Sequence, residues 1–191
     1  MDYLSTRYSF VREWIPAPGC SPIQYLVRLG VLRAHPLLVH GVQVTHDDVQ
    51  VLAAQKIPMA HCARSNALLD CGRMPIERYQ EAGVPLAMGT DGLSSSPSLS
   101  IWDEAKAALR LHHTAGILLE PHVLLQLCTL DSARALGFED LLGSLEPGKV
   151  ARLAIGRRLS STYVEQLVST PDEMLQLLWD GEVTVGALMT A

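Results

Sequence analysis

Residues 37–62 read LLVHGVQVTHDDVQVLAAQKIPMAHC, and this stretch decides the fold class. Its opening run is apolar except for His40, which is typical of a strand buried on both faces. Thr45 predicts a helix N-cap, with Asp48 at the third helical position and apolar residues following at helical spacing. Residues 58–62 predict the next strand. Two strands joined by a helix indicate a βαβ unit and a parallel sheet.

The alternation of strands and helices continues outward from this stretch. A helix near residues 75–82 is expected to stop at Gly83, and a third strand, 84–88, runs into the glycine-flanked Asp91. The remaining expectations are helices at 1–13, 21–29, 100–114 and 120–136, and loops at 63–66 and 94–98.

The tail departs from this pattern. Residues 143–149 are turn-rich, and residues 150–155 predict a strand outside the alternation. Thr170, followed by a proline and then a glutamate, predicts a helix start, and residues 183–188 predict a last strand. The tail is therefore expected to fold differently from the alternating region.

The composition limits the class of protein. The chain has 191 residues, of which 48% are hydrophobic and 18% charged, so it is not a disordered chain. The net charge of -5, with basic residues scattered along the chain, offers no surface for nucleic acid or an anionic membrane. No apolar run reaches the ~18 residues that span a bilayer, and the amino terminus lacks a signal-peptide pattern. We therefore expect a cytoplasmic α/β protein.

The cysteines and histidines limit the kind of metal site. The four cysteines form no C-x-x-C pair, which argues against a zinc ribbon or finger and favours reduced thiols. The seven histidines form neither an H-x-H nor an H-E-x-x-H motif. A catalytic metal would therefore take its ligands from segments far apart in the sequence.

Three polar side chains fall at the ends of predicted strands, where functional groups gather in parallel α/β proteins. His40 closes the first strand, His61 lies near the end of the second, and Asp91 follows the third. Each has a structural alternative: a hydrogen-bonded core histidine for His40 and His61, and a turn-capping carboxylate for Asp91. The glycines on either side of Asp91 leave room for a ligand to approach.

Taken together and in order, these residues resemble the amidohydrolase superfamily, in its cytosine-deaminase-like and chlorohydrolase-like branch. The forms H-C-x-R-S-N and G-T-D-G-x-S-S are most similar to those of deaminases acting on adenine-type nucleosides, the aminodeoxyfutalosine and methylthioadenosine/S-adenosylhomocysteine deaminases. The resemblance covers roughly residues 20–155 and is carried by Val39-His40-Gly41, His61-Cys62-Ala63-Arg64-Ser65-Asn66, Leu68-Leu69, Gly72, residues 88–95, residues 104–108 and residues 142–149.

The resemblance implies a (β/α)8 barrel with a metal at the carboxyl face of its strands. It makes Asp91 a metal ligand that also takes a proton from the attacking water, and it makes His40 a catalytic residue that contacts that water or the substrate. Ser65 and Asn66 fall in the loop after the next strand and become candidate substrate-binding residues, with a structural role in that loop as the alternative. The implied cofactor is Zn²⁺ or another divalent cation such as Fe, Mn or Ni. The implied reaction is hydrolysis of a C–N bond in a small molecule.

The chain departs from the family by lacking its first-strand H-x-H, its strand-five histidine and the nearby catalytic glutamate. We therefore expect a partial barrel, strands six to eight with flanking helices, in residues 1–142. Residues 143–191 would form a tail from the family's small β-rich domain. Such a sheet has two open edges, and the partner implied is a missing amino-terminal half or another copy of the chain.

Two other functions stay open on the sequence alone. One is a non-catalytic remnant or interaction subunit that completes a barrel with another polypeptide. The other is a stand-alone α/β binding module.

Because one carboxylate would hold zinc weakly and unselectively, little ammonia release is expected from this chain alone.

Overall fold

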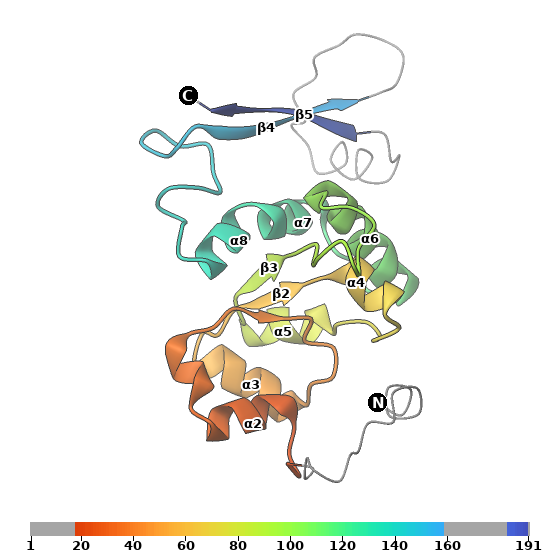
Figure 1. Cartoon of the computed structure of the whole chain (residues 1–191), viewed down its shortest axis with the longest axis vertical. Helices are drawn as coiled ribbons and strands as arrows, with labels where there is room; N and C mark the ends of the chain where they lie inside the picture. The colour runs from red at the N-terminus through yellow and green to blue at the C-terminus, as the bar shows by residue number, and fades with distance from the viewer. Residues whose placement is uncertain (1–17, 159–182, 191) are drawn as a thin grey trace.

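The computed structural model describes residues 18–158 and 183–190 (Figure 1). The predicted helix at 1–13 and the helix start at Thr170 lie outside the described residues. None of the helices within the described ranges is long and apolar enough to cross a membrane.

A three-stranded parallel sheet lies at the centre of the alternating region. Its strands are β1 (Leu38–Val39), β2 (Met59–His61) and β3 (Leu86–Met88), in that spatial order. Leu38 pairs with Met59, and Met59 pairs with Leu86, so the three strands start level. All residues of β2 and β3 are buried, as their apolar runs predict. The same prediction was wrong for β1, where Leu38 is half-buried and Val39 is exposed, because no described strand pairs with its outer edge. The predicted α/β class with parallel strands is confirmed.

Helices follow the strands much as the pattern predicts. α3 (His46–Ala54) begins with a capping box, in which Thr45 and Asp48 bond each other's backbone N–H groups. α5 (Ile76–Ala82) ends at Gly83, whose left-handed backbone closes the helix. The other helices are α2 (Pro22–Arg28), the 3-10 helix η2 (Val31–Ala34), α4 (Ala63–Leu68), α6 (Ile101–Thr114), α7 (Pro121–Cys128) and α8 (Leu130–Ala135).

Two predictions about helices were wrong. Residues 63–66, expected as a loop, begin α4. These residues lack apolar periodicity, but the Arg64 backbone N–H donates to the Glu104 side chain, which supports the first turn of the helix. Residues 120–136, expected as one helix, form α7 and α8, which meet at Thr129 with φ −127° and ψ −96°. The break lets α8 lie beside β3, where Ser132 Oγ accepts the Met88 backbone N–H at 3.2 Å.

β1 is shorter than the predicted run because the chain leaves the extended conformation directly after it. His40 and Gly41 have φ values of 74° and 54°. A Cβ at residue 41 would lie 2.5 Å from Tyr79 Oη and 2.8 Å from Met59 Sδ. Tyr79 Oη also donates to the Gly41 carbonyl at 2.9 Å. Glycine therefore allows a tight turn here, and this turn sets the direction of His40.

The tail contains a separate antiparallel pair, β4 (Arg152–Arg158) and β5 (Val183–Thr190), with an irregularity between Ala154 and Ile155. The predicted strands at 150–155 and 183–188 are confirmed. The division of the chain into domains at residue 142 stays a prediction.

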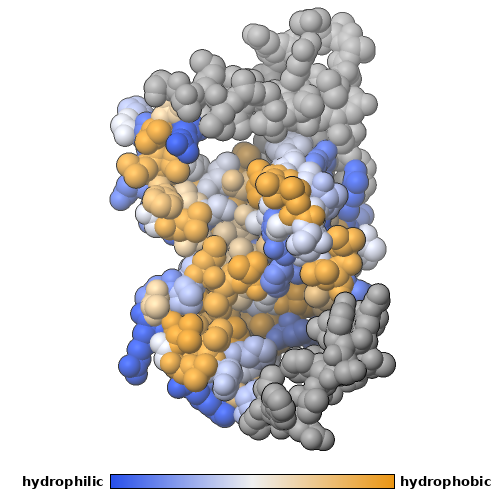
Figure 2. All heavy atoms as spheres, viewed as in Figure 1, coloured by the Kyte–Doolittle hydropathy of each residue, from blue (hydrophilic) through white to orange (hydrophobic). Residues whose placement is uncertain are grey.

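The two outer edges of the parallel sheet differ. α8 covers the edge of β3, whereas no described strand pairs with the outer edge of β1. The backbone N–H groups of Leu38 and His40 donate to the carbonyls of Pro58 and Ala60, so that of Val39 points away from β2. Figure 2 shows apolar side chains over the middle of one face, in the region that the sheet occupies in Figure 1.

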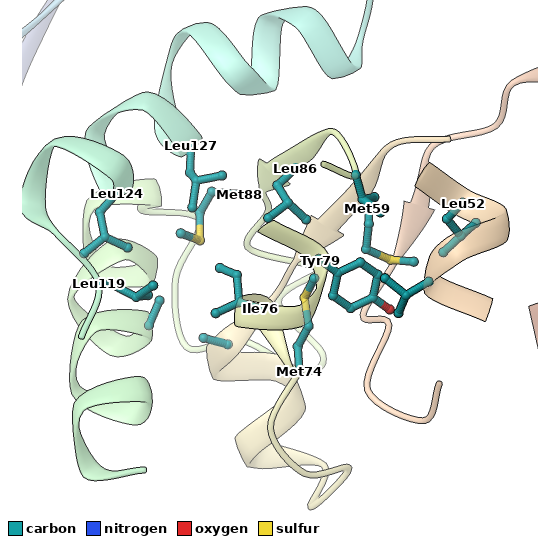
Figure 3. Packing of buried hydrophobic residues seen from close by; sticks show 14 of the residues in the cluster. Leu52, Met59, Met74, Ile76, Tyr79, Leu86, Met88, Leu119, Leu124 and Leu127 are labelled. Atoms are coloured by element: carbon teal, nitrogen blue, oxygen red, sulfur yellow. The ribbon is translucent and has the colours of Figure 1, made fainter. Parts of the chain in front are cut away.

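The hydrophobic core joins the helices to the sheet. Figure 3 shows it running from Leu52 of α3 and Met59 of β2, past Tyr79 of α5, to Leu124 and Leu127 of α7. These side chains are all buried. The core therefore fixes the three strands, and with them the segments that follow their carboxyl ends.

Candidate active site

The carboxyl ends of the three strands bring together side chains that are far apart in the sequence. His40 follows β1, Ser65 and Asn66 lie in α4 directly after β2, and Asp91 follows β3. Parallel strands end at one edge of the sheet, so the segments that follow them meet there. The structure joins all four predicted site residues in one network.

Asp91 is the centre of this network. Its Oδ2 accepts hydrogen bonds from Ser65 Oγ at 2.6 Å and Ser95 Oγ at 2.9 Å, and its Oδ1 accepts the Gly92 N–H at 2.8 Å. The bond from Ser65, followed by those from Gly92 and Ser95, lowers the pKa of Asp91 from 3.8 to about 2. Asp91 is therefore an ionised carboxylate at neutral pH.

His40 faces Asp91 across the edge of the sheet. Its Nε2 lies 3.7 Å from Asp91 Oδ2, and its Nδ1 lies 2.9 Å from Asn66 Oδ1. The side chains of His40 and Asp91 are 41% and 33% exposed, whereas Ser65 and Asn66 are fully buried. Among these four residues, His40 and Asp91 are thus the pair that a small molecule can reach.

α4 is held in place by a buried ion pair. Arg64 donates its backbone N–H to Glu104 Oε1 at 2.8 Å and its Nε to Glu104 Oε2 at 2.6 Å. The same guanidinium also bonds the side chain and carbonyl of Ser98 and the carbonyl of Ser100. Arg64 therefore ties α4 both to α6 and to the loop after Asp91.

His61 belongs to a different network, on the core side of β2. Its Nε2 lies 3.0 Å from His112 Nε2, and Arg73 donates to His112 Nδ1 at 3.0 Å. Both rings are fully buried. Burial, followed by nearby positive charge, lowers the pKa of His61 to about 3 and that of His112 to about 4. The alternative of a hydrogen-bonded core histidine is confirmed for His61.

The cysteines are free thiols, as predicted. Cys62 is buried next to α4, and burial raises its pKa to about 12. It is therefore a neutral thiol at physiological pH and a poor nucleophile.

Three further residues of this region lie in the family motifs but have no predicted role: Ser95, Arg64 and Glu104. Ser95 completes the set of donors to Asp91, and the Arg64–Glu104 pair fixes α4. The signal for Ser95 was its position four residues after Asp91 in a serine-rich loop. Nothing in the sequence pairs Arg64 with a residue forty positions away.

The residues present fit a divalent cation only as part of a ligand set. Asp91 supplies an ionised carboxylate and His40 an imidazole, which are both zinc ligand types. Within the described ranges, however, no group of three His, Cys, Asp or Glu side chains is placed to hold a metal ion. A complete site would need ligands from elsewhere.

Comparison with known proteins identifies the family to which this chain belongs. The profile of the amidohydrolase family matches residues 16–176. The chain belongs to the amidohydrolase family. This confirms the resemblance found in its motifs.

Curated relatives of this amidohydrolase chain include two proteins named 5-methylthioadenosine/S-adenosylhomocysteine deaminase. The Moorella thermoacetica protein is 38% identical over 142 residues, which are 72% of this chain and 33% of the relative. The Thermodesulfovibrio yellowstonii protein is 31% identical over 158 residues, 80% of this chain and 36% of the relative. The chain spans about a third of the length of the curated relatives it matches.

Solved structures agree with the amidohydrolase assignment. An adenosine deaminase from Xanthomonas campestris with bound zinc has a TM-score of 0.72 and 31% identity, covering 91% of this chain and 38% of its own. The atrazine chlorohydrolase of Arthrobacter aurescens complexed with zinc has a TM-score of 0.67 and 27% identity, and the match covers 72% of this chain and 31% of the chlorohydrolase chain.

Proposed function

We propose that this chain provides the carboxyl-terminal strands of a metal-dependent amidohydrolase that hydrolyses a C–N bond in an adenine-type nucleoside. The observation that carries the proposal is the ionised Asp91 facing His40 at the end of the parallel sheet. The names of the two curated relatives and of the Xanthomonas campestris structure support deamination of an adenine ring.

Asp91 and His40 have distinct tasks in this reaction. Asp91 accepts a proton from a water molecule while the water oxygen forms a bond to the carbon that carries the amino group. His40 contacts the same water molecule or the substrate through its Nε2, beside the Asp91 carboxylate. The proton held by Asp91 then passes to the amino nitrogen as the C–N bond breaks, which releases ammonia and leaves the oxygen of the water on the ring carbon. Ser65 and Asn66 are fully buried and bond Asp91 and His40, which favours their structural role over a substrate contact.

The proposed cofactor is zinc or another divalent cation, with Asp91 as one ligand. When bound, it supplies a Lewis acid that lowers the pKa of a coordinated water molecule. The adenosine deaminase and the atrazine chlorohydrolase to which this chain is similar carry zinc, which supports zinc over other metals.

The partial sheet is proposed to be part of a (β/α)8 barrel, with residues 1–142 supplying its last strands and residues 143–191 a small β-rich unit. The outer edge of β1, with which no strand of the described residues pairs, supports this, because it offers backbone groups to a further strand. A polypeptide that carries the other barrel strands, or a second copy of this chain, would be the partner.

The test is a fusion of this chain to the part of the Moorella thermoacetica relative that lies amino-terminal to the matched region. Loaded with zinc, the fusion should release ammonia from methylthioadenosine, S-adenosylhomocysteine or adenosine. This chain alone should release little or none. The variant Asp91→Asn should abolish the activity of the fusion and leave its circular dichroism spectrum unchanged.

Two results would contradict the proposal. Robust turnover by this chain alone would show that its site is complete without further strands. A folded, zinc-loaded fusion that deaminates none of the three nucleosides would leave the substrate class without support. It would favour a non-catalytic subunit, for which the open edge of β1 is the supporting feature.

A further inference from the structure

Asn66 is placed to control the ring of His40. Its Oδ1 lies 2.9 Å from His40 Nδ1, and its side chain is fully buried. An amide oxygen can only accept a hydrogen bond, so the proton of the neutral imidazole lies on Nδ1. The lone pair of the ring is then on Nε2, the nitrogen that faces Asp91 Oδ2 at 3.7 Å.

This tautomer makes Nε2 and the Asp91 carboxylate two acceptors side by side. Two acceptors cannot hydrogen-bond each other, so the pair is suited to a donor or a cation that contacts both. The exposure of both side chains leaves this place open to such a group.

The backbone conformation of His40 places its ring beside Asn66 and Asp91. In a regular strand, alternation would place His40 on the same face as Leu38, which packs against the hydrophobic core. The φ of 74° ends the strand and brings the ring to Asn66 and Asp91 instead. A left-handed non-glycine residue persists where its surroundings hold it, and such residues cluster at functional sites.

Asn66 is itself rigidly held. Its backbone N–H donates to the Cys62 carbonyl at 3.0 Å, and its own carbonyl accepts the Cys71 N–H at 2.9 Å. Its Nδ2 is buried without a hydrogen-bond partner among the described residues. Oδ1 is therefore the end of the Asn66 amide that has a hydrogen-bond partner, His40 Nδ1.

We propose that Asn66 is a positioning residue that holds His40 in the Nδ1–H tautomer, with the Nε2 lone pair beside the Asp91 carboxylate. The role of this pair in the reaction rests on the function proposed above. The tautomer itself does not, and it is measurable on this chain alone.

The experiment is a two-bond ¹H–¹⁵N NMR spectrum of the uniformly ¹⁵N-labelled chain at pH 8, where ordinary imidazole rings are neutral. The His40 signals are assigned by their loss in His40→Gln. The expected spectrum has a protonated Nδ1 and an unprotonated Nε2. Asn66→Asp, whose carboxylate also accepts, should keep Nδ1 protonated, whereas Asn66→Leu should move the proton toward Nε2.

The outcomes separate this inference from the proposed function. A wild-type His40 with its proton on Nε2, or an unchanged spectrum in a folded Asn66→Leu chain, overturns the inference whatever the fusion does. If Asn66→Leu does not fold, the wild-type and Asn66→Asp spectra decide. In an active fusion, Asn66→Leu should lower kcat about 10- to 100-fold with a smaller change in KM, and Asn66→Asp should recover part of it.

Discussion

At the scale of single residues, the site depends on two side chains with left-handed backbone. His40 and Asp91 have φ values of 74° and 59°, a conformation that costs a non-glycine residue about 1–3 kcal/mol. Ser65 bonds Asp91 and the adjacent Asn66 bonds His40. Consecutive residues of one short helix therefore hold both strained residues.

The hydroxyl of Ser65 should control the protonation of Asp91. Ser65→Ala removes the shortest hydrogen bond to the carboxylate, so the pKa of Asp91 should rise from about 2 toward its ordinary 3.8. Because this pKa is lower in the folded chain, the carboxylate favours folding above pH 3.8 and loses that effect as pH falls through about 2. Carboxyl ¹³C NMR from pH 6 down to the lowest pH at which both chains stay folded compares the Asp91 titration in Ser65→Ala with that in the wild type.

Thr90→Ala is the matched control for this prediction. Thr90 Oγ1 donates to the backbone carbonyl of Asp91 and not to its carboxylate. This variant should leave the Asp91 titration where it is. Equal shifts in Thr90→Ala and Ser65→Ala would mean that loop packing, and not the Ser65 hydroxyl, sets the pKa.

At the scale of elements, the contact between α4 and α6 depends on one buried ion pair. Arg64→Met leaves Glu104 as an unpaired charge that is fully buried, which should destabilise the fold by about 3–5 kcal/mol. Urea unfolding monitored by circular dichroism measures the loss. Arg134→Met, which breaks the more exposed pair with Asp131 in α8, should change stability by less than about 1 kcal/mol.

The paired histidines that link β2 to α6 should make the fold sensitive to mild acid. In the folded state His61 and His112 titrate near pH 3 and 4, but in the unfolded chain they take up protons near pH 6.5. The unfolded state therefore binds more protons as pH falls below 6.5. The free energy of unfolding should drop by up to about 1.4 kcal/mol per pH unit for each ring.

Urea midpoints between pH 8 and pH 4.5 test this acid sensitivity. His112→Gln removes one of the two rings and should make stability less dependent on pH. His122→Gln removes an exposed histidine of α7 and should keep the full dependence. If the stability of the wild-type chain is constant between pH 8 and pH 4.5, then the His61 and His112 rings are not both held neutral in the folded chain, which would contradict this prediction.

Elements were predictable where their signals are local. Thr45 and Gly83 mark helix ends by their own chemistry, and the structure places helix boundaries at both. α4 was missed because its support comes from Glu104, forty residues away. The break at Thr129 was missed because the residues on both sides favour helix.

The candidate site was predictable by residue type and not by geometry. His40, Ser65, Asn66 and Asp91 were all chosen from motifs, and they do meet. The sequence could not show that His40 leaves the strand with a positive φ or that Asn66 bonds its ring. Both features depend on a backbone conformation that residue identity alone does not specify.

At the scale of the whole molecule, the outer edge of β1 should matter only when further strands are present. Val39→Pro removes the N–H of β1 that points to this edge, whereas the N–H groups of Leu38 and His40, which donate to the carbonyls of Pro58 and Ala60, are kept. In the fusion, this variant should cost about 1–3 kcal/mol because it leaves a carbonyl of the added strand unpaired. Thermal unfolding of the chain alone should change much less.

Val39→Thr keeps the backbone N–H and is the control for this comparison. It should behave like the wild type in both the fusion and the isolated chain. Equal destabilisation of the isolated chain and the fusion by Val39→Pro would show that the edge is not used for pairing.

The loop after Asp91 has a consequence for protein engineering. Ser95 bonds the carboxylate and Ser98 is clamped by Arg64, while Leu93 and Leu99 of the same loop are 67% and 62% exposed. The loop is therefore held by hydrogen bonds at Ser95 and Ser98, whereas the side chains of Leu93 and Leu99 are exposed to solvent. A combinatorial library of substitutions at Leu93 and Leu99 should change the side chains beside the site and leave the Asp91 carboxylate in place.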